Sequence, residues 1–284
     1  MEKILKETER TYMLNRNLRK ALLFVLFSLI FSGLALVATY FTDLSIPGTS
    51  GYYAVIAAYF LGPLLSAFIV EKIMSHENLL KTLDINFVFN FWSLSAVVIP
   101  LVFLPLTIGL SLLMPDTTFA GARFNLMEVI KGFLVGGTVV AIVAFFAVCG
   151  FAGLLFKELV YMGFWTSSYL TGIFAALWLA PLLIITNYYD ANYSLGALSM
   201  IALFVMAVLP ILTFVKCKTK NIFVPSILAG ILFATASFSV GLIFGGELIL
   251  LGVAGLSGII AATIIAAVIY VYNRFLTEAY KRLY

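Results

Sequence analysis

Eight long apolar runs constrain this chain more than any other feature of its sequence. A run of about 20 apolar residues crosses the roughly 30 Å hydrocarbon core of a membrane as an α-helix, and a helix satisfies its own backbone hydrogen bonds there. Only 11% of the residues are charged, whereas soluble domains average about 25%. We therefore predict an all-α polytopic membrane protein, a single bundle of about eight transmembrane helices with no separate soluble domain. The runs cover residues 21–41, 52–72, 91–114, 129–156, 164–187, 194–215, 222–243 and 248–272.

The distribution of basic residues predicts the orientation in the membrane. If the N-terminus is cytosolic, all of the 17 basic residues except Arg123 and Lys131 fall in cytosolic segments. An excess of Lys and Arg in short loops marks the cytosolic side. We expect both termini in the cytosol, with a basic arm or interfacial helix at 1–20, the transmembrane domain at 21–272 and a tail at 273–284.

Two basic segments predict contacts with membrane lipids. The arm carries six basic residues, which favour binding to anionic headgroups, with docking of a specific partner as the alternative. Lys216, Lys218 and Lys220 follow the sixth run, and we expect them to contact anionic lipid. The segment is too short for a nucleic-acid footprint, so no nucleic-acid partner is expected. Trp165 and Tyr169, near the predicted cytosolic mouth, fit interfacial anchoring and ligand contact equally well.

The reactive residues exclude several kinds of chemistry. No acidic or basic residue falls clearly in the middle of a predicted span, which argues against a proton pump or a carrier of charged substrates. Lys157 and Glu158, which end the fourth run, come closest, and we expect them to form an ion pair at a helix end. The single histidine, His76, is expected on a short surface helix, so neither a zinc site nor serine catalysis is predicted. We expect no cofactor and no metal, and no disulfide between Cys149 and Cys217.

Small and hydroxyl-bearing residues are expected to serve helix packing. Gly136, Gly137, Gly150 and Gly153 allow a neighbouring helix to approach closely. Hydroxyl groups at plausible membrane depth predict hydrogen bonds between helices, although they would also suit a path for a neutral solute. These residues are Thr138, Thr171, Ser199, Thr235, Ser237 and Ser239.

Three segments carry a resemblance to a known family. Residues 157–164 (KELVYMGF) resemble a Glu-Glu-x-x-x-Arg-Gly-aromatic motif, residues 176–182 (ALWLAPL) resemble Ala-Leu-Trp-His-x-Pro-Leu, and residues 227–234 (ILAGILFA) resemble Ile-Leu-x-His-Ala-Leu-x-Asn. These are the motifs of the CAAX protease and bacteriocin-processing membrane proteins, also called CPBP or Abi proteins, of the Ras-converting-enzyme type. The likeness covers about 50–245. It implies an eight-helix fold of a prokaryotic plasma membrane and intramembrane cleavage of prenylated peptides.

The chain departs from that family at the positions that carry the chemistry. In the family the first Glu is thought to activate water, and the histidines and the asparagine to position water and stabilise the oxyanion. Of the motif positions only Glu158, the second of the Glu pair, is retained. Loss of a general base costs about 10² to 10⁴ in rate and loss of an oxyanion donor about 10² to 10³. The substituted positions are Lys157 for the first Glu, Met162 for Arg, Leu179 and Gly230 for the two histidines, and Ala234 for Asn.

These departures favour a binding protein over an enzyme. We predict a pseudoprotease that binds a lipid, a prenylated or otherwise lipophilic peptide, or a transmembrane helix of a partner protein. Two alternatives stay open, an active CAAX-type endopeptidase with a rearranged site and a transporter or subunit of a membrane complex.

Overall fold

The computed structural model of the protein describes residues 2–40, 50–74, 79–86, 88, 90–121, 124–185, 194–247 and 249–275. Within these residues eight helices are long and apolar enough to cross a membrane. This confirms the predicted all-α, multi-pass membrane protein. The spans are Leu14–Ala38, Gly51–Met74, Phe91–Ser111, Leu126–Met162, Phe164–Ile184, Leu198–Thr219, Phe223–Gly241 and Leu256–Arg274.

The elements follow one another along the chain with short connections. The first half contains α1 (Glu2–Tyr40), α2 (Ser50–Met74), α3 (Leu79–Thr82), η1 (Phe91–Leu94), α4 (Ser95–Ser111), β1 (Thr117–Phe119), α5 (Leu126–Val135), η3 (Gly136–Val140), α6 (Ala141–Val148), η4 (Cys149–Leu155), α7 (Phe156–Leu159) and η5 (Val160–Met162). The second half contains α8 (Phe164–Ile185), α9 (Ser194–Thr219), α10 (Phe223–Ala234), α11 (Ala236–Gly241), β2 (Ile243–Gly245) and α12 (Leu256–Phe275).

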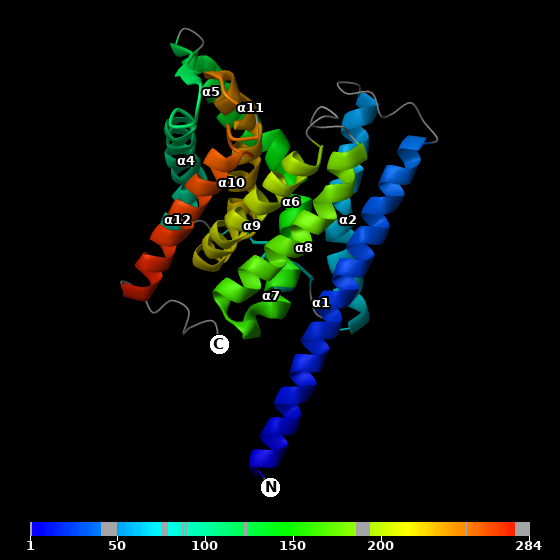
Figure 1. Ribbon diagram of the computed structural model, residues 1–284. Coiled ribbons are helices and arrows are strands. Elements are labelled where there is room, and N and C mark those ends of the chain that lie inside the picture. Colours follow the sequence, from blue (N-terminus) through cyan, green and yellow to red (C-terminus); the bar gives the residue numbers. More distant parts are fainter. Residues whose placement is uncertain are drawn as a thin grey trace.

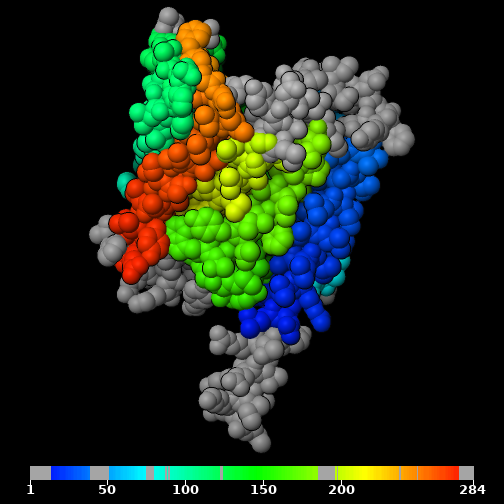
Figure 2. All heavy atoms as spheres, in the orientation of Figure 1, coloured from blue at the N-terminus to red at the C-terminus, as the bar shows by residue number. Residues whose placement is uncertain are grey.

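The helices form one bundle that combines contacts between consecutive spans with contacts between spans distant in the sequence (Figure 1). α1 packs against α2 at one edge, α8 packs against α9, and α12 contacts both α9 and α4 at the opposite edge. α10 packs against α4, α6 and α9. The start of α1 and the end of α12 lie at the same end of the bundle, which we call the terminal end (Figure 1). Figure 2 shows α12, α8 and α1 side by side across one face of the molecule.

α1 shows how a membrane helix divides its surface. The buried residues recur every three or four positions and form its inner face. The outer face exposes large apolar side chains to the lipid. Ser32 and Lys20 on the inner face form hydrogen bonds to α2, so polar groups are used for contacts between helices. The buried residues are Lys20, Ala21, Phe24, Ser28, Ser32 and Leu36, and the exposed ones include Leu22, Leu26, Ile30 and Leu34.

The N-terminal boundary differs from the predicted one. Residues 2–20 continue into the first span as a single helix that projects beyond the bundle at the terminal end (Figure 1). The division at residue 20 therefore falls inside α1. At the other terminus Asn273 still belongs to α12, and residues 276–284 of the predicted tail lie outside the described residues, as do His76 and Arg123.

The fourth span is interrupted by two π-helical stretches, η3 and η4. Both contain the glycines that the sequence assigned to close packing. A Cβ on Gly136 would lie 2.6 Å from Ile231 Cα of α10, and one on Gly150 would lie 2.6 Å from Pro63 Cβ of α2. These glycines thus allow α10 and α2 to pack closely against the fourth span, as expected. π-helical turns of this kind widen a helix locally and are often found at functional sites.

At the end of the bundle opposite the terminal end, polar contacts join distant segments. β1 and β2 pair antiparallel, with Thr118 opposite Phe244. Ser111 of α4 and Ser257 of α12 are linked through their hydroxyl groups at 2.7 Å. These contacts tie the third, seventh and eighth spans together near their ends.

Candidate functional site

A buried ion cluster joins three helices at the terminal end of the bundle. Lys20 Nζ of α1 lies 3.1 Å from Glu71 Oε1 and 3.3 Å from Glu71 Oε2 on α2. The same ammonium group lies 3.3 Å from Glu158 Oε1 on α7. The three residues are 4%, 1% and 4% exposed, respectively. We call Lys20, Glu71 and Glu158 the ion cluster.

The ion cluster contains contacts that the sequence reasoning did not include. First, Lys20 and Glu71 lie within the spans Leu14–Ala38 and Gly51–Met74, although neither was singled out as a buried charge. Second, Glu158 forms a buried bridge to Lys20, whereas the sequence named only its exposed neighbour Lys157 as a partner. The sequence contained a signal for the contact between Lys20 and Glu71. The first two spans run antiparallel, so residue 20, just before the first apolar run, lies at the same depth as residue 71, at the end of the second run.

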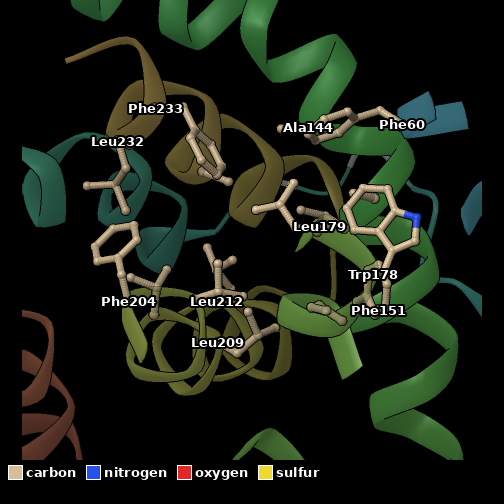
Figure 3. A pocket seen from close by; sticks show the side chains of 17 residues that line it. Phe60, Ala144, Phe151, Trp178, Leu179, Phe204, Leu209, Leu212, Leu232 and Phe233 are labelled. Carbon is tan, nitrogen blue, oxygen red and sulfur yellow. The ribbon is translucent and has the colours of Figure 1, made fainter. Parts of the chain in front are cut away.

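A small apolar cavity lies between α6, α8, α9 and α10 (Figure 3). Its volume is about 80 Å³. The side chains that line it are hydrocarbon except for the indole nitrogen of Trp178, which donates to Ser32 Oγ at 2.7 Å outside the cavity. Leu179, which the motif resemblance aligns with a histidine, is among the lining residues. The lining is Phe60, Ala144, Ala147, Val148, Phe151, Ala152, Ala175, Trp178, Leu179, Phe204, Val205, Val208, Leu209, Leu212, Ala229, Leu232 and Phe233.

Trp178 separates this cavity from α1. Its ring lies 4.9 Å from that of Tyr59 and 5.2 Å from those of Phe60 and Phe151, centroid to centroid. Ser32 Oγ also donates to the backbone oxygen of Tyr59 at 2.8 Å, and the Tyr59 hydroxyl donates to the backbone oxygen of Trp178. Hydrogen bonds between α1, α2 and α8 therefore fix the aromatic wall of the cavity.

The remaining motif positions lie in other surroundings. Gly230 packs directly on the backbone of the fourth span, because a Cβ there would lie 2.6 Å from Ala141 N. Ala234 lies close to Gly136, and Met162 is 39% exposed in η5. Glu158 is absent from the lining of the cavity. The structure therefore places Glu158 in the ion cluster, Leu179 in the apolar cavity and Gly230 in a helix-helix contact.

The three predicted lipid-contacting lysines have different environments. Lys216 is buried, and its ammonium group lies 3.1 Å from Asp84 Oδ2. Lys218 is surrounded by the rings of Trp92, Phe214 and Tyr272, whose centroids lie 5.2, 5.5 and 5.4 Å from Nζ. Lys220 is exposed. Contacts of this kind between a cation and aromatic faces are stabilising.

The two predicted aromatic contact residues lie together near the start of the span Phe164–Ile184. The Trp165 ring lies 6.2 Å from the ring of Tyr169 and 5.5 Å from that of Tyr270 on α12. Tyr169 is 40% exposed, and Arg274 Nη1 donates to the Tyr270 hydroxyl at 2.6 Å. Aromatic and basic side chains gather in this way at membrane interfaces.

The hydroxyl groups do not gather into a polar path among the described side chains. Thr138, Ser199 and Thr235 donate to backbone oxygens of their own helices. Thr171 is buried with no hydrogen-bond partner among the described residues. None of these residues lines the apolar cavity, and the Ser237 side chain lies outside the described residues.

No model of a known protein family matches the chain, and no curated protein matches it. The described residues also hold no group of three or more His, Cys, Asp or Glu side chains able to bind a metal ion. Fold and site define a class, an integral multi-pass membrane protein whose described residues form eight helices able to span a membrane, with a buried ion cluster at one end and an apolar cavity inside.

Proposed function

We propose that this protein is a non-catalytic membrane protein that binds an apolar molecule within its bundle, in the plasma membrane of a prokaryote and with both termini in the cytosol. The observation that carries the proposal is the separation of Glu158 from the apolar cavity. Glu158, the retained motif acid, is bonded to Lys20, and Leu179 faces a space lined by hydrocarbon.

The ion cluster supports the loss of hydrolysis. A general base has to reach the proton of its water or substrate within hydrogen-bond distance. Glu158 instead accepts a hydrogen bond from a buried ammonium group that it shares with Glu71. We infer that its role is to join α7 to α1 and α2.

The other motif positions support the same proposal. Stabilising an oxyanion requires hydrogen-bond donors aimed at the developing charge. Leu179, Gly230 and Ala234 have no donor in their side chains, and the contact between Gly230 and Ala141 leaves no space for a larger residue. The chain would thus resemble the CAAX-type proteases in architecture and in lipophilic binding, without their reaction.

The cavity supports binding of an apolar group. A lipid chain, a prenyl group on a peptide or an apolar side chain of a partner's transmembrane helix would meet only hydrocarbon there. An active endopeptidase with a rearranged site and a transporter remain alternatives, and neither gains support from the arrangement of the described polar side chains.

Hydrolysis of a prenylated peptide tests the proposal. We expect purified protein in lipid vesicles to leave a farnesylated CAAX-type peptide uncleaved, as the Glu158→Gln variant does. Glu128→Gln is the matched control, because Glu128 forms an exposed pair with Lys131 at 2.8 Å, remote in sequence from the motifs. Cleavage that is lost in Glu158→Gln and kept in Glu128→Gln would show an active protease and overturn the proposal.

A further inference from the structure

We infer that the cavity takes the methyl end of a hydrocarbon chain from the surrounding bilayer, which enters sideways at Phe233 on α10. This inference rests on the proposed binding function and selects one occupant from those it leaves open. It commits to a hydrocarbon chain, acyl or isoprenoid, rather than to a headgroup, a peptide backbone or a whole transmembrane helix.

The chemistry of the walls selects hydrocarbon. A buried water molecule needs two to four polar partners, and cavities lined by Leu, Ile and Phe stay dry. The indole nitrogen of Trp178 is bonded to Ser32 behind the wall, so it offers the cavity no hydrogen bond. A headgroup or peptide bond placed here would lose its hydrogen bonds without replacement, at a cost of several kcal/mol.

The volume selects the end of a chain. An engineered cavity of about 150 Å³ binds one benzene molecule. The cavity here, at about 80 Å³, is roughly half as large and holds on the order of three carbon atoms. A terminal segment of a chain fits, whereas a helix of a partner protein does not.

The exposure of the lining shows where a chain would enter. Phe233 is 47% exposed, whereas the other lining residues are buried or half-buried. Figure 3 shows the Phe233 ring on the opposite side of the cavity from Trp178, which α1 and α2 cover. Because the exposed apolar surface of a membrane protein faces lipid, Phe233 connects the cavity with the hydrocarbon of the bilayer.

Photo-crosslinking with labelled lipids tests this inference. The protein is placed in phosphatidylcholine vesicles that contain a lipid with a diazirine at the methyl end of its acyl chain or, in a parallel sample, next to the headgroup. A third sample carries the diazirine at the end of an isoprenoid chain. We expect one or both chain-end probes to label peptides that contain Phe233, Leu232 or Phe204, and the headgroup-proximal probe to leave them unlabelled.

Filling the cavity should remove this labelling. Ala175→Leu adds carbon atoms to the wall on α8 and displaces about two methylene groups of ligand, each worth about 0.8 kcal/mol, so labelling should fall about tenfold. Ala147→Leu, which fills the cavity from α6, provides a second variant if the first folds poorly. Ala58→Leu is the matched control, because Ala58 is exposed on α2 and outside the lining, and it should label as the unmodified chain does.

The inference is overturned if neither chain-end probe labels the lining, if the headgroup-proximal probe labels it equally, or if both filling variants keep full labelling. These outcomes are distinct from failure of the proposed function, which is read from peptide cleavage. If the protein neither cleaves the peptide nor shows the labelling, the proposed loss of hydrolysis stands and the hydrocarbon site is rejected.

Discussion

Lys20 Nζ and Glu158 Oε1 lie 3.3 Å apart in the interior of the bundle, although 138 positions separate the two residues along the chain. Lys20 belongs to the first helix, and Glu158 is the acid that the resemblance would place in an active site. Because both side chains are nearly fully buried, the contact is part of the packing between α1, α2 and α7.

Lys20→Met should destabilise the protein strongly. Removing one partner of a buried ion pair typically costs about 3 to 5 kcal/mol, because the other charge is left uncompensated. The triple variant Lys20→Met/Glu71→Gln/Glu158→Gln should recover most of that loss, since no charge then remains in the cluster. Unfolding in mixed detergent micelles, followed by circular dichroism, measures both.

The control for this prediction is Lys131→Met. Lys131 and Glu128 form an exposed pair at 2.8 Å, and exposed pairs contribute about 0 to 1 kcal/mol. If Lys20→Met costs no more than Lys131→Met, the ion cluster does not stabilise the junction of α1, α2 and α7.

Gly230→Ala should also destabilise the protein. A Cβ at Gly230 would lie 2.6 Å from Ala141 N, so α10 has to move away from the fourth span, and overpacking of this kind costs about 1 to 3 kcal/mol. Gly109→Ala on α4 is the matched control, because a Cβ there meets no atom within 4 Å. The control should be neutral or slightly stabilising, since Ala is the better helix former. Equal effects of the two substitutions on the unfolding free energy would mean that Gly230 is not a close contact.

Ser32→Ala should loosen α1 from the aromatic wall of the cavity. It removes the acceptor of the Trp178 indole and a hydrogen bond to Tyr59, and hydrogen bonds between membrane helices are worth about 0.6 kcal/mol on average and up to about 1.7. We expect a loss near the upper value and a change in Trp fluorescence. Ser199→Ala, whose hydroxyl bonds only to Gly196 of its own helix among the contacts described, should change neither quantity. Unchanged fluorescence in Ser32→Ala would contradict the assigned contact.

The sequence was sufficient to predict the architecture because apolar length alone decides which segments cross a membrane. Each of the eight predicted runs corresponds to a span, for example 164–187 to Phe164–Ile184. One boundary shifted where a charged residue is paired inside the bundle. The run predicted at 129–156 extends to Met162 because the buried pairing of Glu158 with Lys20 lets the charged end remain within the bundle.

The candidate site could be predicted only in part, for physical reasons. Leu179 was named from the motif likeness, but its apolar surroundings depend on Phe204, Leu212 and Phe233, which belong to helices far along the chain. Lys20 was interpreted as part of a basic arm because its partner, Glu71, is distant in sequence. Burial and charge pairing across helices depend on tertiary packing, which hydropathy does not report.

Native mass spectrometry of the protein released from its own membrane in mild detergent tests the central claim most directly. We expect the intact protein to carry a hydrophobic ligand of lipid or isoprenoid mass, with the bound fraction reduced in Ala175→Leu and unchanged in Ala58→Leu. A protein that carries no ligand and releases a cleaved product from a farnesylated peptide would contradict the claim that this bundle binds hydrocarbon without hydrolysis.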